Sequence, residues 1–496
     1  MSGRKSIWII CWICSEPGSD SPNVRIYISE NYLHGCRTAA DSARDTAANG
    51  GKMGQINELI KGISGSLWNF PMLVLLGGVH LYFTIRLGFI QKRLPEGLRL
   101  SISGEKGAER EKASLSPYAA LSTALAATIG TGNIIGISAA IATGGPGAVF
   151  WCWISGFFGM ATCYAESMLS AKYRLKRADG SFYGGPMYVM ERILHQKWLA
   201  CIFSFFAVLA AMCVGSSVQA HSLTAAVVSR IPVSPHLVGI CAAMLAGSVL
   251  VGGSEKTARV CTCLVPVMSF FYLGGCVYVI VQNAAWVPEA LRAMVVSAFS
   301  SRAVIGGITG TAVMTAIRTG MAKGLFTNEA GMGSMPMTAA AADMGSPVRQ
   351  GLVSMTGVFW DTIVMCAITA LAVLSDMIKN KAPYMDAAQD RYCFVAFSGL
   401  PFAGEEILSL CLVLFSFATM IGWSFYGECA ARYLWGEKGV RVFQVLYIVF
   451  IYIGSVLSLE LVWNLSDICN ACMALPNLLC LWLLRKTIIR QTWQER

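Results

Sequence analysis

Charge is scarce in this sequence. Charged residues make up 13% of the 496 positions, against roughly 25% in ordinary soluble domains. Hydrophobic residues make up 55%, and a soluble protein of this length would need far more polar surface to cover its core. The composition therefore excludes an ordinary soluble protein and indicates a chain that is surrounded by lipid.

Residue clusters that carry enzyme chemistry are also missing. The five histidines are not paired at metal-ligand spacing, and neither a GxSxG nor an HExxH motif occurs. Cys11 and Cys14 form one CxxC pair, but no second pair or nearby histidine completes a zinc site. Many of the 18 cysteines lie in apolar runs, where cysteine behaves as a small hydrophobe. We therefore expect neither an enzyme nor a cofactor.

Long apolar runs are what the sequence offers instead. A helix needs ~20 mostly apolar residues to cross ~30 Å of hydrocarbon, and the sequence predicts an all-α polytopic membrane protein with about eleven such helices. Their predicted ranges are 68–90, 115–143, 147–172, 198–217, 236–252, 260–281, 303–343 (interrupted), 351–374, 404–426, 442–460 and 466–485.

Basic residues set the predicted orientation. The loop from Arg86 to Lys112 is the most basic in the chain, and cytoplasmic loops of membrane proteins carry an excess of Lys and Arg. We therefore expect a multi-pass protein of the cell membrane with its N-terminus outside and its C-terminus in the cytoplasm. These loops explain the net charge of +10, which does not indicate a nucleic-acid partner. Counting helices from the first loop predicts further cytoplasmic loops at 173–197, 253–259, 344–350 and 427–441.

The first 52 residues do not fit this pattern. They are polar, their apolar run Ile7–Cys14 is too short to span a bilayer, and its flanks lack a convincing cleavage site for a signal peptide. Met53 opens a short amphipathic stretch that leads directly into the first helix. We hypothesise that Met53 is the true start and that the preceding segment is disordered or never made. The alternative is a genuine soluble tail.

One predicted span contains a sequence that a helix tolerates poorly. Gly130-Thr131-Gly132-Asn133 lies near its middle. Backbone groups released from a helix in lipid are costly unless they face protein, water or a ligand, so a break implies a cavity. The half-helix starting near Gly132 would offer N–H groups to a carboxylate, and the carbonyls before the break would suit a small cation. The alternative is close helix packing through small residues.

A second break favours the cavity. The segment Gly324–Gly333 interrupts another apolar stretch, and five helices open with each break, over 115–281 and 303–485. Paired breaks at corresponding positions indicate an inverted-repeat transporter with a site at the midplane, whereas a channel needs a continuous pore. The predicted parts are an N-terminal extension (1–52), a first helix with its basic cytoplasmic loop (53–114), two five-helix repeats (115–281 and 282–485) and a cytoplasmic tail (486–496).

Around these breaks the sequence resembles the alanine/glycine:cation symporter family, also called sodium:alanine symporters. The resemblance spans roughly Leu67 to Arg485. It implies a leucine-transporter-type core of ten helices preceded by one extra helix, and sodium-coupled uptake of alanine or glycine, with D-alanine possible. The motifs that carry the resemblance are Gly130–Ile134, Gly144–Gly147, Gly159–Thr162 with Tyr164–Glu166, Gly184–Tyr188, Thr327–Ser334, Pro347–Gly351 and Ile421–Trp423.

The resemblance also implies a set of binding residues. Two of the substrate residues named below have an alternative role: Gln219 would only bridge helices, and Trp423 would be an anchor at the membrane interface. The sodium ion would be bound by the backbone carbonyls of Ala126 and Ile129 and the hydroxyls of Ser416 and Thr419. The substrate would contact Thr131, Gly132, Asn133, Gln219, Phe326, Asn328, Thr419 and Trp423.

Three departures from the family pattern bear on ion choice and substrate preference. The usual Ser-Thr pair reads Ala418-Thr419, the stretch Met335–Ala339 lacks the histidine common after the second break, and Cys163 replaces a basic residue. Because Ala418 removes a hydroxyl, a proton-coupled amino-acid transporter on the same scaffold stays an alternative. The order of preference among alanine, glycine and serine and the number of sodium ions stay open.

Overall fold

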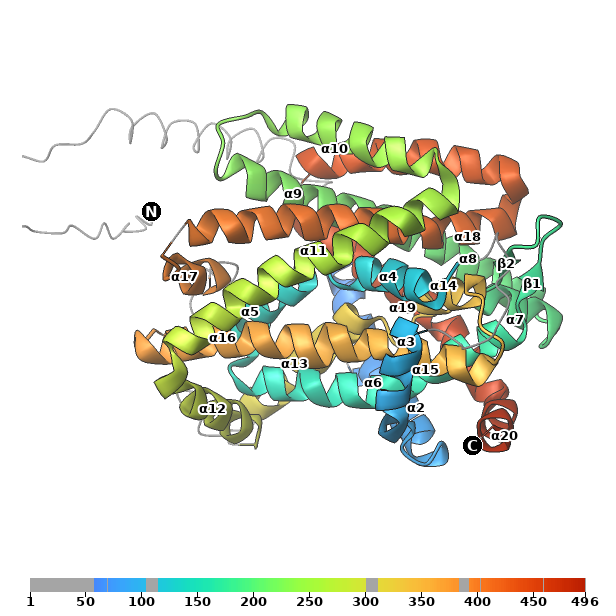
Figure 1. Ribbon diagram of the computed structural model, residues 1–496, viewed down its shortest axis with the longest axis horizontal. Helices are drawn as coiled ribbons and strands as arrows, with labels where there is room; N and C mark the ends of the chain where they lie inside the picture. The colour runs from blue at the N-terminus through green and yellow to red at the C-terminus, as the bar shows by residue number, and fades with distance from the viewer. Residues whose placement is uncertain are drawn as a thin grey trace, which may run out of the picture. The chain divides into compact units, whose positions relative to one another are not determined.

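The computed structural model describes residues 58–68, 70–103, 115–299, 311–382, 392–401, 403–457 and 459–495, so the N-terminal extension predicted over 1–52 lies outside the described residues. The described part is helical except for one two-stranded hairpin (Figure 1), as expected from the composition. The longer elements are α2 (Phe70–Arg86), α3 (Leu94–Ser103), α4 (Pro117–Thr128), α5 (Ile137–Gly144), α6 (Gly147–Lys172), α8 (Lys197–Ala210), α9 (Gln219–Val228), α10 (Pro235–Leu250), α11 (Gly253–Gln282), α12 (Val287–Phe299), α13 (Thr311–Asn328), α15 (Pro347–Val358), α16 (Ala367–Lys379), α18 (Gly404–Val456), α19 (Leu459–Leu483) and α20 (Arg485–Gln494).

Shorter elements connect these helices. Three π-helical segments continue into or out of long helices, and a hairpin of two-residue strands follows α6. The short elements are η1 (Ile90–Arg93), η2 (Gly132–Gly136), β1 (Leu175–Lys176), β2 (Phe182–Tyr183), α7 (Pro186–Arg192), η3 (Ala211–Val218), η4 (Ala284–Trp286), α14 (Met335–Ala341), η5 (Phe359–Cys366) and α17 (Tyr392–Ser398).

Seven helices of the described residues are long and apolar enough to cross a membrane, and the bent pair formed by α4 and η2–α5 is an eighth candidate. The prediction of eleven spans exceeds these eight by three, and each of the three has its own reason for not being counted. α10 has 16 residues and falls short of the usual length, α13 follows the undescribed residues 300–310, and α18 contains two predicted spans. The count of eleven stays a prediction.

The predicted loop 427–441 contains a turn, but the turn is shorter than predicted. Helical residues lie on both sides of Gly436, where two helices meet and the chain reverses; its φ of 68° and ψ of −162° are non-helical and accessible to glycine. The two halves then lie side by side (Figure 1): Tyr447 donates a hydrogen bond to the carbonyl of Met420 over 2.7 Å. Two segments outside the predicted spans are also helical: α12 lies between the spans predicted over 260–281 and 303–343, and α20 begins at the last residue of the span predicted over 466–485 and continues into the tail.

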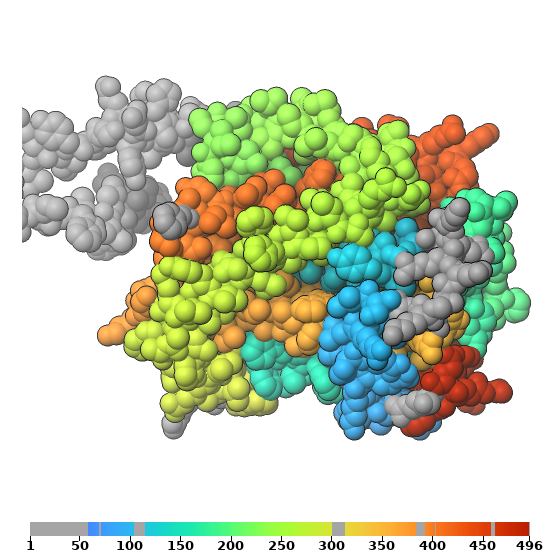
Figure 2. Space-filling model, in the orientation of Figure 1, coloured from blue at the N-terminus to red at the C-terminus, as the bar shows by residue number. Residues whose placement is uncertain are grey.

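The outer surface suits lipid. α11 runs diagonally across the face seen in Figure 2, next to α10, and both helices expose large apolar side chains such as Leu245 and Phe270, which are 60% and 75% exposed. Inside, helices approach closely through small residues, as membrane helices do. A Cβ on Gly324 of α13 would lie 2.9 Å from the Cβ of Ser155 on α6.

Local signals explain where the two core helices α4 and α15 begin. Each starts with a Ser-Pro pair in which the serine hydroxyl accepts a backbone N–H and the proline occupies the first turn. Ser116 accepts from the N–H of Ala119 over 3.1 Å, and Ser346 accepts from the N–H of Arg349 over 3.2 Å. These caps fix the starts of α4, which runs to the first break, and of α15, which continues into η5.

Candidate functional site at two helix breaks

The first predicted break is present. α4 ends at Thr128, and the chain continues in η2 and α5 at an angle of 53° to α4. Ile129 leaves the helical conformation with φ −74° and ψ 88°. The N–H of Gly130 donates to the side-chain oxygen of Asn133 over 3.1 Å. One freed backbone group is thus satisfied locally, and the break is an ordered turn.

The second predicted break is present as well. α13 ends at Asn328 and α14 begins at Met335. Between them Glu329, Gly331 and Gly333 have φ values of 52°, 87° and 83°. Two of these three left-handed positions are glycines, which adopt that conformation without steric cost. Gly331 and Gly333 therefore occur in this motif because the chain has a left-handed backbone conformation at both positions.

The two breaks face one another. A Cβ built on Gly132 would lie 3.1 Å from the methyl carbon of Thr327 and 3.6 Å from the ring of Phe326. Because Gly132 belongs to η2 and Phe326 and Thr327 to the last turn of α13, the unwound part of one helix touches the end of the other. Close packing through small residues and an unwound turn therefore occur together at this point.

Helix α9 brings a polar side chain to the first break. The hydroxyl of Thr131 donates to the amide oxygen of Gln219 over 3.3 Å, and the amide nitrogen of Gln219 donates to the carbonyl of Val214 over 3.4 Å. Gln219 directly follows the π-helical segment η3, and π-bulges are frequent at functional sites. The predicted partners Thr131 and Gln219 are thus brought together, and both are almost fully buried.

Helix α18 contributes the other predicted hydroxyl. The hydroxyl of Thr419 lies 3.5 Å from the carbonyl oxygen of Ile129, and it faces Gly130. Gly422, one turn further along α18, packs against Ala127. This side of α18 therefore lies against the end of α4, where the predicted carbonyls of Ala126 and Ile129 are located.

Ser416 lies on the same face of α18 as Thr419, since residues three apart are neighbours on a helix. Its side chain is fully buried, and its hydroxyl has no hydrogen-bond partner among the described residues. Buried hydroxyls normally have a partner, so this one has capacity for a ligand. Ala418, where the family pattern has serine, is also fully buried.

Two predicted substrate residues are engaged elsewhere. The amide nitrogen of Asn133 donates to the carboxylate of Asp361 over 2.8 Å and to its backbone carbonyl over 3.1 Å. The side-chain oxygen of Asn328 accepts from the N–H of Ala330 over 3.0 Å. Both asparagines therefore stabilise the broken segments, and their contact with a substrate stays a prediction.

Asp361 forms several buried hydrogen bonds whose partners could not be predicted from the sequence. Besides Asn133, its carboxylate accepts a hydrogen bond from Thr362 over 2.8 Å, and Thr362 in turn lies 3.3 Å from the hydroxyl of Thr327. This links η5 to both breaks. A charged residue at membrane depth indicates a functional position, so the sequence could mark Asp361. Which groups Asp361 contacts is visible only in the folded structure.

Trp423 lies inside the protein and is 1% exposed. Its ring packs edge-on against Tyr426 at 5.5 Å, and its side chain lies against Gly215 of η3. The alternative of an anchor at the membrane interface is therefore wrong, because an anchor would stand at the surface.

The cap of the second break is Glu166 of α6, not Glu329. One carboxylate oxygen of Glu166 accepts from the N–H of Gly331 over 3.3 Å, and the other accepts from the side-chain amide of Asn477 over 2.8 Å. Asn477 of α19 also donates to the carbonyl of Gly331 over 2.9 Å. Glu329 accepts from the hydroxyl of Ser334 over 2.6 Å. Glu166 stands in a recognised motif, yet its role is visible only in space.

Lys323 precedes the second break by one turn. Its ammonium group lies 5.9 Å from the ring centre of Phe326 and 5.4 Å from that of Trp463, and it interacts electrostatically with Asp467 of α19. The rings of Phe326 and Trp463 are 5.0 Å apart. Asp467 is thus an acidic group close enough to Lys323 to interact with it.

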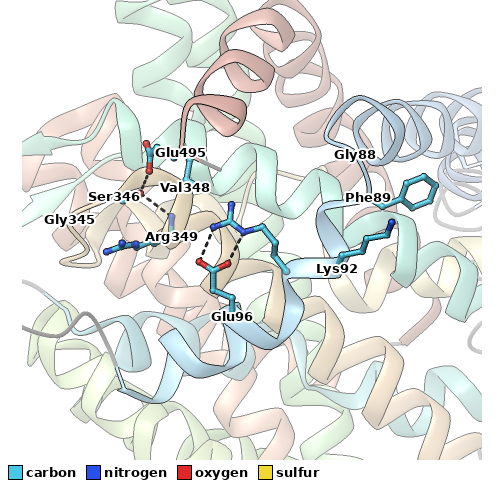
Figure 3. Close-up of a pocket in the computed structure, with 10 residues that line it drawn as sticks. Gly88, Phe89, Lys92, Glu96, Gly345, Ser346, Val348, Arg349 and Glu495 are labelled. Carbon is cyan, nitrogen blue, oxygen red and sulfur yellow. Dashed lines mark hydrogen bonds and ion pairs between the residues drawn. The ribbon is translucent and has the colours of Figure 1, made fainter.

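A separate polar pocket of about 1050 Å³ lies between η1, α3, α15 and α20 (Figure 3). Arg93 donates two hydrogen bonds to Glu96, of 2.7 and 2.8 Å, and these bonds hold the pKa of the Glu96 carboxyl below its ordinary value. Ser346 donates to Glu495, the residue after α20. The pocket lies at the basic loops, apart from the residues of the breaks, so we place the candidate site at the breaks.

No cluster of three or more His, Cys, Asp or Glu side chains is placed to hold a metal ion within the described ranges. The cysteines of those ranges are all free. Besides the separate carboxylates of Asp361, Glu166 and Glu329, the breaks offer backbone groups, hydroxyls and amides. Such groups suit a zwitterion and a hard monovalent cation better than a transition metal.

Comparison with solved structures supports the fold. The chain is similar to MhsT, whose crystal structure was determined in complex with L-phenylalanine, with a TM-score of 0.56 and 12% sequence identity. The match covers 76% of this chain and 90% of MhsT. At this identity the likeness concerns the fold alone, which is of the leucine-transporter type.

Comparison of sequences is more specific. The chain is 40% identical to the sodium/alanine symporter AgcS of Methanococcus maripaludis over 88% of this chain and 96% of that protein. It is 35% identical to a Bacillus subtilis protein named probable sodium/glutamine symporter GlnT, over 88% and 90%. The description of the sodium:alanine symporter family matches residues 53–494. The chain therefore belongs to the sodium:alanine symporter family, and it is a multi-pass membrane transporter of a sodium-coupled amino-acid symporter family, not an enzyme.

Proposed function

We propose that this protein takes up a small neutral amino acid, namely alanine, glycine or D-alanine, together with Na⁺ by alternating access. The observation that carries the proposal is the meeting of the two breaks, with Gly132 against Phe326 and Thr131 bonded to Gln219. The relatives named for alanine and glutamine transport point to the same chemical class of substrate.

The substrate carboxylate would bind at the first break. The half-helix that starts there directs free N–H groups and the positive end of its dipole toward the break. One N–H group is already taken at each break, that of Gly331 by Glu166 and that of Gly130 by Asn133. The second break also holds the carboxylate of Glu166, which would repel an anion, so the first break is the better anion site. Gln219 would contribute a donor and an acceptor, and Phe326 and Trp423 would limit the space for the substrate side chain.

Sodium would bind between α4 and α18. Na⁺ is a hard cation that prefers oxygen ligands, and the carbonyls of Ala126 and Ile129 end the half-helix whose dipole is negative there. Thr419 would add its hydroxyl, which already lies 3.5 Å from the Ile129 carbonyl. Ser416 would supply the second hydroxyl in place of the one that Ala418 removes, since it is buried and unpartnered among the described residues.

For the membrane arrangement we propose eleven spans, consisting of one extra helix and two inverted repeats of five, over 115–281 and 282–485. The N-terminus would lie outside and the C-terminus in the cytoplasm of a cell membrane. The basic loops support this orientation, and the two breaks occupy corresponding positions of the repeats.

Uptake by the purified protein in proteoliposomes tests the proposal. Radiolabelled alanine, glycine, serine and D-alanine are offered with an inward Na⁺ gradient or with choline in place of Na⁺, at fixed pH. We expect concentrative uptake of alanine or glycine with Na⁺ alone. Equal uptake with choline would reject sodium coupling, and no uptake of any small amino acid would reject the substrate class.

A proton-coupled transporter on the same scaffold is the second candidate, and Ala418 is the residue that favours it. If the hydroxyl missing at this position removes the sodium ligand set, a pH gradient would replace the Na⁺ gradient as the driving force. The same vesicles with an inward proton gradient in choline distinguish the two candidates. Uptake that follows the pH gradient and ignores Na⁺ would favour the second one.

A further inference from the structure

A groove of about 850 Å³ follows the outer surface between α2, α8 and α19. Aliphatic side chains such as Val74, Ile202 and Leu479, each 40% or more exposed, line it. At Gly78 of α2 the groove is open, because a Cβ built there meets no atom within 4 Å. The groove therefore forms a long apolar slot that opens toward lipid.

One end of the groove is aromatic. Trp198 at the start of α8 and Trp482 at the end of α19 both line it, and the ring of Trp482 lies 5.0 Å from that of Tyr82 on α2. α8 and α19 are aligned so that these two tryptophans share an end, since Phe203 and Asn477 meet at Gly333. Trp and Tyr are typical of the level of lipid headgroups.

The same end is cationic. Lys197 directly precedes Trp198 and its side chain is 77% exposed, while the guanidinium of Arg485 lies 4.7 Å from the ring centre of Trp482. Lys486 is also exposed. Lys197 has an acidic neighbour, Glu191, whose carboxylate lies 3.9 Å from the Lys197 ammonium group. An apolar slot therefore ends at a basic rim at headgroup level.

We propose that this groove binds an anionic glycerophospholipid, with an acyl chain in the slot and the phosphate and headgroup against Lys197 and Arg485. Basic pockets between membrane helices recognise anionic headgroups in this way. A second copy of the chain fits less well, because two grooves facing each other across a two-fold axis would bring the two basic rims together. The inference requires a membrane-embedded chain and does not depend on the substrate or the coupling ion.

Native mass spectrometry of the full-length protein in detergent tests the proposal. The protein is incubated with equal concentrations of phosphatidylglycerol and phosphatidylcholine that carry identical acyl chains, and the retained lipids are counted. A basic side chain near a membrane surface favours an anionic lipid by about fivefold, so with two of them we expect phosphatidylglycerol to exceed phosphatidylcholine by roughly 25-fold. Equal retention of the two lipids would overturn the proposal.

Two variants locate the lipid. The double substitution Lys197→Gln and Arg485→Gln should abolish the preference for phosphatidylglycerol, whereas Lys256→Gln, which removes an exposed charge elsewhere, should leave it. Gly78→Trp should fill the slot and reduce retention of phosphatidylglycerol. Its control is Gly274→Trp on α11, where a Cβ also meets no atom within 4 Å.

Each outcome of this comparison is informative, provided that thermal melting shows all variants to be folded. Loss of phosphatidylglycerol with Gly78→Trp but not with Gly274→Trp supports the proposal. Equal retention by these two variants shows that the lipid lies elsewhere and overturns it. If Gly78→Trp instead converts a dimer to a monomer without loss of lipid, the groove is occupied by a second copy and the lipid proposal is wrong.

Discussion

Gly130 faces the hydroxyl of Thr419 so closely that a Cβ on the glycine would lie 2.7 Å from the Thr419 oxygen. The contact joins the first break to α18 at the point where we place the sodium ion. Even one added methyl group therefore has to push the two helices apart or displace the hydroxyl.

Gly130→Ala should impair sodium-dependent uptake. Overpacking of this kind costs about 1–3 kcal/mol, so we expect the apparent affinity for Na⁺ to fall by on the order of tenfold. The measurement is the Na⁺ dependence of alanine uptake in proteoliposomes. Gly136→Ala is the matched control, since a Cβ on this nearby glycine meets no atom within 4 Å. Equal Na⁺ dependence of the two variants would contradict the prediction.

Gln219→Ala should weaken transport while leaving membrane insertion intact. The variant removes the amide that accepts from Thr131, and a substrate held by that amide loses one or two hydrogen bonds of about 0.5–1.5 kcal/mol each. We expect a rise of the KM for alanine by about tenfold. Gln282→Ala, which changes an exposed glutamine at the end of α11, controls for the loss of an amide. A KM unchanged in both variants would place the substrate elsewhere.

Removing a hydroxyl from α18 and adding one should change the Na⁺ dependence of uptake in opposite directions. Thr419→Val removes an oxygen while keeping the shape of the side chain, so the Na⁺ dependence of uptake should weaken. Ala418→Ser adds the hydroxyl that the family pattern has at this position, and it should strengthen that dependence. Both effects are read as the Na⁺ concentration that gives half-maximal uptake. A shift of both variants in the same direction would be incompatible with sodium ligation by α18.

The sequence predicted the positions of both breaks because the physics there is local. Gly-rich segments such as 130–133 cannot sustain a helix, and lipid leaves few ways to satisfy the freed backbone groups. Gly331 and Gly333 stand where the chain needs left-handed conformations. Hydropathy and helix propensity could not predict that Thr131 and Gln219 lie together, because 88 residues separate them. That prediction rested on the resemblance to a family.

What the sequence left out depends on contacts between distant segments. The reversal at Gly436 was predicted as a loop of 427–441, because Gly436, Glu437 and Lys438 form a short Gly-containing polar run; that the helices extend to both sides of this glycine follows only from the fold. The cap of the second break has the same origin: Glu329 is nearer in sequence, whereas Glu166 reaches the break from α6. Periodicity and hydropathy report which residues are buried, but not which buried polar groups meet.

Glu166→Leu should destabilise the protein. It leaves the N–H of Gly331 without its acceptor and removes one of the two acceptors of the Asn477 amide, and an unsatisfied buried group costs roughly 1–3 kcal/mol. We expect a lower melting temperature in detergent, with uptake lost in proportion to the folded fraction or more. Glu166→Gln keeps the shape and one acceptor oxygen, so its melting temperature should lie between those of Glu166→Leu and the wild type. A melting temperature of Glu166→Leu equal to that of the wild type would rule out the capping role.

The final helix α20 should contribute measurably to stability, although the sequence marks it as a simple tail. Its Thr492 is fully buried and lies 2.9 Å from the hydroxyl of Tyr164 on α6, and Trp493 donates to the carbonyl of Arg86 over 3.4 Å. A double-mutant cycle of Tyr164→Phe and Thr492→Val, read by denaturant unfolding in detergent, should give a coupling energy of about 1 kcal/mol. Strictly additive effects of the two substitutions would show that α20 does not dock on α6 as described, and the helix would then be free to leave the face that carries the basic loops.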